Sequence, residues 1–347
     1  MLKVAIKGVL AHKRRLLSTS LAVLLGVSFL CGTLVMSDTI QRTFSNLLET
    51  VNSGTDAYLR SNQTIAVSER GPGSNVEHAH IDESIVATVQ QVPGVAAVSP
   101  QVQGRATILD KAGNELGSGG RGAPDLAFNW GTDAQLNPFK LAEGTAPQAD
   151  NEIVIDRGSA KQAGYQIGDS VQVEVTEAKT YKLVGIATFG KEDNSGGATT
   201  VMFTLPVAEQ LFAGTGKIDA VLARATPGVT QTELQSRIAA VMPSNIEVLT
   251  GAQITQEQQD QFQSRIKDFT TFFSAFGYIA VLVGAFVIYN TFSIIIAQRT
   301  RELALLRAVG AARKQVLASV LIEALTVGIV ASVVGVVVGL GVGAGLR

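Results

Sequence analysis

Cysteine is almost absent from this sequence, and its scarcity narrows the possible kinds of protein at once. The one cysteine, Cys31, lies inside an apolar run. A disulfide framework needs paired cysteines and a thiolate metal site needs several, so both are excluded. Charged residues are also scarce, at 16%, whereas hydrophobic residues reach 46% and the mean hydropathy is +0.26. These values predict a membrane protein with a substantial soluble part.

Nucleotide-binding and catalytic motifs are missing as well. Gly117, Gly119 and Gly122 spell G-x-G-x-x-G, but Ala-Pro-Asp follows in place of the helix that a dinucleotide site needs. Lys217 in GTGKI is followed by isoleucine, whereas a P-loop needs serine or threonine for magnesium. With only three histidines, no Ser-His-acid set is evident. We therefore expect no catalytic residues, no cofactor and no nucleic-acid partner.

The segment EHAHIDE is the one cluster with metal-binding side chains. His78 and His80 share one side of an extended segment, and imidazole with carboxylate suits Zn²⁺ or Cu²⁺. Few enclosing partners are available, however, and the segment precedes a helix that Asp82 or Ser84 would cap. We therefore favour a helix start over a metal site.

Three apolar runs are long enough to cross a bilayer, since a spanning helix needs about 20 apolar residues. They cover residues 16–36, 269–297 and 317–346, and the third contains a single charge, Glu323. The first run is longer than the usual ~7–15 residues of a signal peptide, so we expect an uncleaved anchor. An ionisable group within a span faces protein or water, or reaches the interface.

Basic residues gather on one side of these runs. Residues 1–15 carry five basic residues and no acid, and the loop at 298–316 is also basic. Residues 37–268 instead carry 17 basic and 27 acidic residues, a net charge of −10. By the positive-inside rule, the N-terminus and the loop face the cytoplasm, and residues 37–268 form an extracytoplasmic domain of a multi-pass cell-membrane protein.

Amphipathic patterns continue the first and second spans into this domain. SDTIQRTFSNLLETVN and ITQEQQDQFQSRIKDFTTFF each keep apolar residues on one helical face, which predicts a pair of stalk helices. The alternative is that these segments form two juxtamembrane helices that only pack on the domain.

The domain itself alternates strand and helix patterns. DAYLR and VAAVSPQVQGRATIL predict strands around the helix in IDESIVATVQQVPG, and IDAVLARA, TQTELQSRIAAVMP and NIEVLTG repeat this order. Two β-α-β units predict an α+β domain of split ferredoxin-like type. Between them, residues 110–215 predict a β-rich insertion of short alternating strands with glycine turns, including NEIVIDRGSAKQAGYQIGDSVQVEV.

Glycine spacing in the third span predicts close helix packing. Gly335, Gly339 and Gly343 recur every four residues, and Gly341 and Gly345 repeat the spacing. Small residues at this interval let helices approach closely in lipid. The alternative is that glycine is simply common in such spans.

The basic loop after the second span reads QRTRELALLRAVGAARKQVLASVLIEAL. With the stalk pattern and NEIVIDRGSAKQAGYQIGDSV, this segment resembles the MacB/FtsX-like family of ABC-transporter permeases, and the likeness covers nearly the whole chain. The resemblance implies a MacB-like periplasmic core domain, an FtsX-like permease domain and transport or mechanotransmission. Family members carry a further span after the third, so an incomplete permease domain is expected.

The resemblance also implies that residues 298–316 form a coupling helix on a separate cytoplasmic ABC ATPase subunit. Leucines would supply an apolar contact and arginines would pair with acids. The implied residues are Arg301, Glu302, Leu303, Leu306, Arg307, Gly310 and Arg313. The alternative is that these basic residues only anchor the loop inside. Further implied partners are a second permease copy or half, membrane lipid and an extracytoplasmic protein.

Two other functions remain open at this point. A membrane-anchored receptor would bind a ligand outside, but only about 15 and 18 residues face inward to carry an output. A scaffold that regulates cell-wall enzymes would share the ATPase and use the domain to bind a protein.

Overall fold

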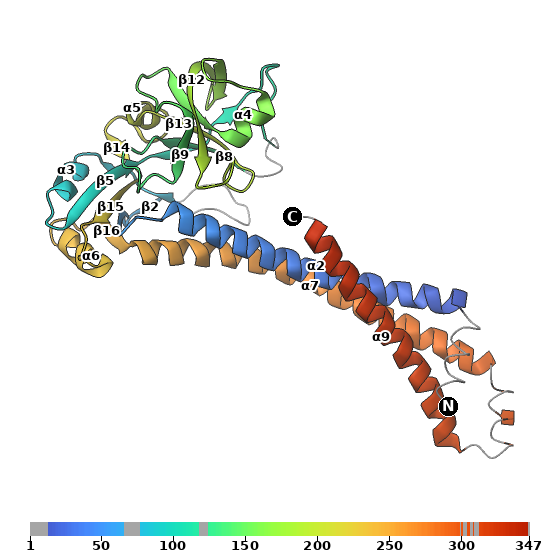
Figure 1. Ribbon diagram of the computed structural model, residues 1–347. Coiled ribbons are helices and arrows are strands. Elements are labelled where there is room, and N and C mark those ends of the chain that lie inside the picture. Colours follow the sequence, from blue (N-terminus) through green and yellow to red (C-terminus); the bar gives the residue numbers. More distant parts are fainter. Residues whose placement is uncertain are drawn as a thin grey trace. The chain divides into compact units, whose positions relative to one another are not determined.

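A computed structural model describes residues 13–65, 77–117, 124–298, 300, 304–305, 308 and 312–345 (Figure 1). These residues fall into two compact units. The helical unit takes the described residues up to Arg42 and from Gln263 onward, and the sheet unit takes those from Thr43 to Phe262.

Three long helices dominate the described chain: α2 (Lys13–Val51), α7 (Gly251–Gln298) and α9 (Arg313–Gly345). Each contains a stretch long and apolar enough to cross a membrane. This agrees with the three apolar runs in the sequence. The helices α2 and α7 also extend through both amphipathic segments, as the 3.6-residue pattern predicted.

The sheet unit begins with a four-stranded antiparallel sheet in the order β16-β1-β15-β5. Its strands are β1 (Ala57–Ser61), β5 (Val95–Gln101), β15 (Ala220–Ala225) and β16 (Ile246–Thr250). Ala57 on β1 pairs with Ala223 on one side and Thr250 on the other. Helix α3 (Ile85–Gln90) precedes β5, and α6 (Gln231–Ala239) joins β15 to β16.

An eight-stranded mixed sheet is inserted between β5 and β15. Its order is β6-β8-β13-β10-β12-β11-β7, with β9 also paired to β12. The strands are β6 (Gln103–Gly104), β7 (Thr107–Ile108), β8 (Asp125–Asn129), β9 (Phe139–Gly144), β10 (Glu152–Asp156), β11 (Ser170–Glu174), β12 (Ala178–Phe189) and β13 (Thr199–Phe203). β12 reaches three partners because it is twelve residues long.

Short elements complete the sheet unit. Two-stranded ladders join β2 (Thr64–Ile65) to β3 (Glu77–His78) and β4 (Ile81–Asp82) to β14 (Lys217–Ile218). Helices α4 (Arg157–Ala163), α5 (Leu205–Ala208) and the π-helical turn η1 (Glu209–Ala213) pack among the inserted strands. A continuous apolar cluster runs through both sheets and includes Leu59, Val89, Phe203 and Leu234.

The single strand predicted over residues 95–109 is wrong: the chain forms β5, β6 and β7 instead. The break occurs because side chains accept the backbone donors there. The Val102 N–H bonds to the Asn129 side chain at 2.7 Å, and the Gln103 N–H bonds to the Asp219 carboxylate at 2.7 Å. The chain therefore leaves the first sheet at this point, and the insertion begins earlier than residue 110.

The prediction of a β-rich insertion is confirmed by the eight-stranded sheet, but within residues 151–175 helix α4 separates β10 from β11 where the pattern predicted only strands and a glycine turn. Asp156 caps this helix and accepts the Ser159 N–H at 2.8 Å, while Gly164 ends it with a φ of +67°. Both signals are readable in DRGSAKQAG. The strand β10 is buried at four successive positions and so lacks the expected alternation.

Candidate functional site

The predicted coupling residues lie largely outside the residues that the structure describes. This applies to Arg301, Glu302, Leu303, Leu306, Arg307 and Gly310. Arg313 is the first residue of α9. Among their neighbours, Leu305 is described as helical and strongly exposed. Their assignment to an ATPase contact therefore stays a prediction.

Within the helical unit, glycines bring α9 against α2. A Cβ on Gly335 would meet Val27 at 3.0 Å, and one on Gly339 would lie 2.8 Å from both the Cys31 Cβ and the Ser28 carbonyl oxygen. The Ser28 hydroxyl donates to the Gly335 carbonyl at 2.9 Å across the same contact. Close backbone approach with an interhelical hydrogen bond is typical of packing in lipid.

The other predicted glycines are placed differently. Gly341 and Gly345 have open space where a side chain would project. Gly343 lies on α9, and its surroundings are outside the description, as are those of the Glu323 side chain. The described close contact therefore involves Gly335 and Gly339.

A second glycine contact, which the sequence analysis missed, joins α2 to α7. A Cβ on Gly26 would lie 3.0 Å from the Val281 nitrogen, one on Gly277 would meet Leu30 at 3.0 Å, and one on Gly284 would meet Val23 at 3.1 Å. Gly277 and Gly284 are seven residues apart, two helical turns, and this spacing was a readable signal. The Ser37 and Thr270 hydroxyls add a hydrogen bond of 2.8 Å between the same helices.

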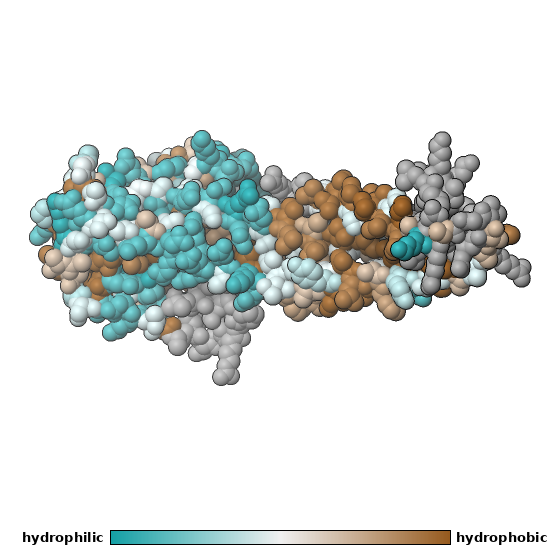
Figure 2. Space-filling view, turned by 90° about the horizontal axis from the view of Figure 1, so that it is seen from below, coloured by the Kyte–Doolittle hydropathy of each residue, from teal (hydrophilic) through white to brown (hydrophobic). Residues whose placement is uncertain are grey.

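Large apolar side chains remain exposed on the helical unit, where Figure 2 shows a brown surface. Water would make such a surface unfavourable, so lipid or another protein must cover it. On α7 the exposed residues include Phe272, Phe276, Tyr278, Ile279, Leu282, Phe286 and Tyr289; on α9 they include Leu325, Ile329, Val333, Val337 and Leu340.

In the sheet unit, α7 starts directly where β16 ends, without a loop. Thr250 and Gln253 form a reciprocal capping box: the Gln253 N–H donates to Thr250 Oγ1 at 3.1 Å, and the Thr250 N–H donates to Gln253 Oε1 at 2.8 Å. Gly251 is required here, because a Cβ would collide with the Thr55 carbonyl oxygen. The start of α7 is thus fixed to the four-stranded sheet.

The end of α2 turns into β1 within five residues. Gly54 allows the turn, since its φ is +85°. The Asn52 amide donates to Gln258 on α7 at 2.9 Å, and Phe44 stacks on Phe262 with ring centroids 3.5 Å apart. The two helices therefore enter neighbouring strands, β1 and β16, while remaining paired in the sheet unit.

Arg60 on β1 connects this strand to β16 and to α7. Its guanidinium bonds to Glu247 on β16 and, at 2.8 and 3.0 Å, to both oxygens of Glu257 on α7. Burial lowers the pKa of Arg60, but the hydrogen bonds to Glu257 and Glu247 outweigh it and raise the pKa above its ordinary value. The arginine side chain is only 12% exposed, so solvent screens this pairing less than an open surface pair.

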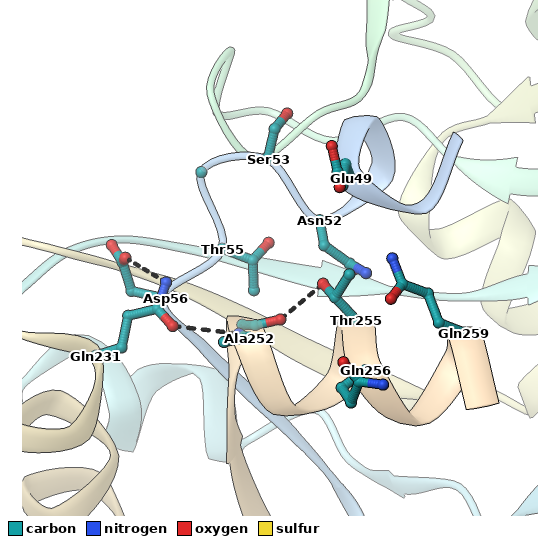
Figure 3. A pocket seen from close by; sticks show the side chains of 12 residues that line it. Glu49, Asn52, Ser53, Thr55, Asp56, Gln231, Ala252, Thr255, Gln256 and Gln259 are labelled. Atoms are coloured by element: carbon teal, nitrogen blue, oxygen red, sulfur yellow. Dashed lines mark hydrogen bonds between the residues drawn. The ribbon is translucent and has the colours of Figure 1, made fainter. Parts of the chain in front are cut away.

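A polar cleft of about 450 Å³ lies beside this junction (Figure 3). The Ala252 N–H donates to Gln231 across it at 3.2 Å, and the Thr255 hydroxyl donates to the Gly251 carbonyl at 2.8 Å. The lining residues are Glu49, Asn52, Ser53, Gly54, Thr55, Asp56, Gln231, Gly251, Ala252, Thr255, Gln256 and Gln259.

The histidine pair bonds within the protein. His78 Nδ1 lies 2.6 Å from the Ser61 carbonyl, and His80 Nδ1 lies 2.7 Å from Asp219. Within the described ranges, no group of three histidine, cysteine or acidic side chains is arranged to hold a metal ion.

Known protein families and structures resemble this chain. The family profile of the MacB-like periplasmic core domain matches residues 16–241, and that of the FtsX-like permease C-terminal domain matches residues 274–346. The chain resembles the periplasmic region of MacB from Actinobacillus actinomycetemcomitans with a TM-score of 0.43 and 13% identity, over 60% of this chain and 94% of that structure.

Curated relatives agree with this match. An uncharacterized ABC transporter permease protein of Mycobacterium tuberculosis is 29% identical over 50% of this chain and 20% of its own length. The macrolide export ATP-binding/permease protein MacB of Psychrobacter cryohalolentis is 22% identical over 94% of this chain and 49% of that protein. The chain thus spans half or less of these relatives' lengths, and it belongs to the MacB/FtsX-like family of ABC transporter permeases.

Proposed function

We propose that this permease transmits ATP-driven movement from its membrane helices to the extracytoplasmic domain. The observation that supports this proposal is how the two helices join the sheet unit. Helix α2 runs into β1, α7 follows the neighbouring strand β16, and Arg60 on β1 bonds to both β16 and α7. A continuous helix is a stiff element with a rise of about 1.5 Å per residue. The same movement would serve export of a substrate, extraction of lipid or lipoprotein, or control of a cell-wall enzyme.

The ATP would be hydrolysed by a separate cytoplasmic subunit, with residues 298–316 as the coupling helix. Support comes from the FtsX-like match over residues 274–346, which includes this segment. The relatives named ATP-binding/permease proteins extend well beyond the matched region. A second permease copy or half would cover part of the exposed apolar surface of α7 and α9, and lipid the remainder.

The orientation follows from the charge sorting. Residues 1–15 and 298–316 would lie in the cytoplasm, spans at 16–36, 269–297 and 317–346 in the membrane, and residues 37–268 outside. Maleimide labelling of Lys179→Cys and Ala312→Cys, each in a Cys31→Ser background, tests this arrangement. Labelling of both positions from the same side of intact cells would contradict it.

We also assign the four-stranded sheet to the ferredoxin-like type. Its strands β1, β5, β15 and β16 occur in the order 4-1-3-2 across an antiparallel sheet, with α3 and α6 as the crossing helices. A split β-α-β arrangement has this order. The eight-stranded insertion then occupies the connection between the second and third strands.

The experiment begins by copurifying the chain from its native membrane to identify the ATPase subunit. Glu302→Ala and Arg307→Glu should then weaken ATPase binding or uncouple hydrolysis from function, because truncating one partner of a buried charge pair costs about 2–5 kcal/mol. Lys314→Ala, near the membrane edge, is the matched control and should matter less. Normal association and coupled activity in both variants would favour simple positive-inside anchoring.

A further inference from the structure

A second cavity of about 400 Å³ lies wholly within the sheet unit, and its chemistry differs from that of the polar cleft. Its lining comes from the end of α2, from Phe262 on α7, from β5 and β15 of the four-stranded sheet, and from the inserted strands with their loops. Its size falls in the range of about 300–1,000 Å³ that is usual for small-molecule sites.

Aromatic rings dominate this cavity. Five of the lining residues are phenylalanines, and none of the lining residues is charged. Phe128, Phe139 and Phe189 form a packed series with centroids 5.6 Å apart at each step. A charged ligand would lose its hydration here without gaining a partner, so the occupant must be neutral and largely apolar.

Polar groups in the wall restrict the occupant further. The amides of Asn129 and Asn137 each donate one hydrogen bond to a backbone carbonyl and accept one from a backbone N–H, so both have protein partners. Ser195 differs, because its hydroxyl oxygen is buried and has no hydrogen-bond partner within the described protein. A buried hydroxyl without a partner is costly, and a ligand carbonyl would satisfy it.

We infer that this cavity binds an acyl chain whose ester or amide carbonyl accepts a hydrogen bond from Ser195. At roughly 30 Å³ for each small group in a liquid, the volume holds a chain of about a dozen carbons. Leu48 on α2 and Phe262 on α7 both line the cavity, so the ligand contacts both helices that enter the sheet unit. Binding requires no ATPase partner, and its failure would leave the proposed transmission untouched.

The chain carries a reporter for this site. Its only tryptophan, Trp130, lies between Asn129 and Gly131, which both line the cavity, and packs on the neighbouring apolar cluster. Methyl ω-bromoundecanoate is a neutral ester whose bromine quenches tryptophan fluorescence. Titrating it into the full chain in nanodiscs of unbrominated lipid should give saturable quenching that methyl undecanoate reverses.

Variants separate site binding from partition into the bilayer. Leu48→Asp places a charge in the uncharged wall and should weaken binding by at least about tenfold. Asn46→Asp adds the same charge on the exposed side of that helix turn and should leave affinity unchanged. Ser195→Ala removes one hydrogen bond and should weaken binding about fivefold.

Linear, unsaturable quenching that is alike in all three variants would overturn the proposal. Circular dichroism establishes whether each variant folds. If Leu48→Asp does not fold, the test rests on Ser195→Ala. An unchanged affinity of Ser195→Ala for the brominated ester would contradict the proposed site. Competition by a short diacyl phospholipid would identify membrane lipid as the source of the chain, whereas competition by a diacylated lipopeptide would identify a lipid-modified protein.

Discussion

In the helical unit, α2 meets its neighbours through glycines. In the sheet unit, an aromatic stack and a side-chain hydrogen bond join α2 to α7, while a capping box and charge pairs fix α7 to the strands β16 and β1. The surroundings explain the difference. Lipid offers no hydrophobic drive for helix association, so close backbone approach must supply the contact. Water around the sheet unit favours apolar burial and lets directional polar bonds fix the geometry. The two regions should therefore respond to opposite kinds of substitution.

The largest effect is expected from Gly339→Leu. A side chain there would overlap Cys31 and Ser28 on α2, and overpacking of this kind costs about 1–3 kcal/mol or more. Gly341→Leu is the matched control, because that position has open space and should keep or slightly raise stability. Thermal unfolding in detergent compares the two variants, and equal losses would show that α9 does not pack on α2 through Gly339.

Arg60→Ala tests the polar side of the comparison. It leaves Glu247 and Glu257 without their cation, so the sheet unit should lose about 1–3 kcal/mol. Arg42→Ala removes an exposed pair with Asp38, in which both side chains are more than half exposed, and should cost at most about 0.5 kcal/mol. Denaturant unfolding followed at Trp130 measures both variants. If Arg60→Ala lost no more stability than Arg42→Ala, Arg60 would not stabilise the connection between β1, β16 and α7.

A smaller loss is expected for Asn52→Ala. Its side chain links α2 to Gln258 of α7 by one hydrogen bond, which is worth about 0.5–1.5 kcal/mol. Asn46→Ala, on the exposed face of the same helix, should change stability by less than about 0.5 kcal/mol. The same unfolding measurement applies, and indistinguishable variants would mean that the Asn52–Gln258 hydrogen bond does not help to pair the two helices in the sheet unit.

The sequence predicts those parts of the molecule whose patterns are local. Apolar runs and helical periodicity identify α2, α7 and α9, and short strand-forming segments around predicted helices identify β1, β15 and β16. The end of β5 could not be predicted, because it depends on Asn129 and Asp219, which are distant in the sequence. The Thr250–Gln253 capping box was a readable local signal, but the need for glycine at position 251 arises from Thr55, almost two hundred residues away.

The contacts of the candidate site also include some that local sequence patterns predict and some that only the fold creates. Regular spacing indicated Gly335 and Gly339, whereas Gly26 becomes a contact residue only once α7 lies beside it. Arg60 stands in a short strand with nothing nearby in the sequence to suggest its two carboxylate partners. Non-local pairing of this kind is decided by the fold and cannot be read from spacing.

The transmission account is tested most directly by breaking α7 between the helical unit and β16. Asp260→Pro removes a helical hydrogen bond and kinks the helix, whereas Asp260→Ala preserves it and serves as control. Hydrogen–deuterium exchange of β1 and β16 would be measured in the complex with its ATPase, with and without ATP and vanadate. We predict that nucleotide changes exchange in both strands in the wild type and in Asp260→Ala, and that this response disappears in Asp260→Pro although ATP hydrolysis continues. An undiminished response in Asp260→Pro would contradict transmission through α7.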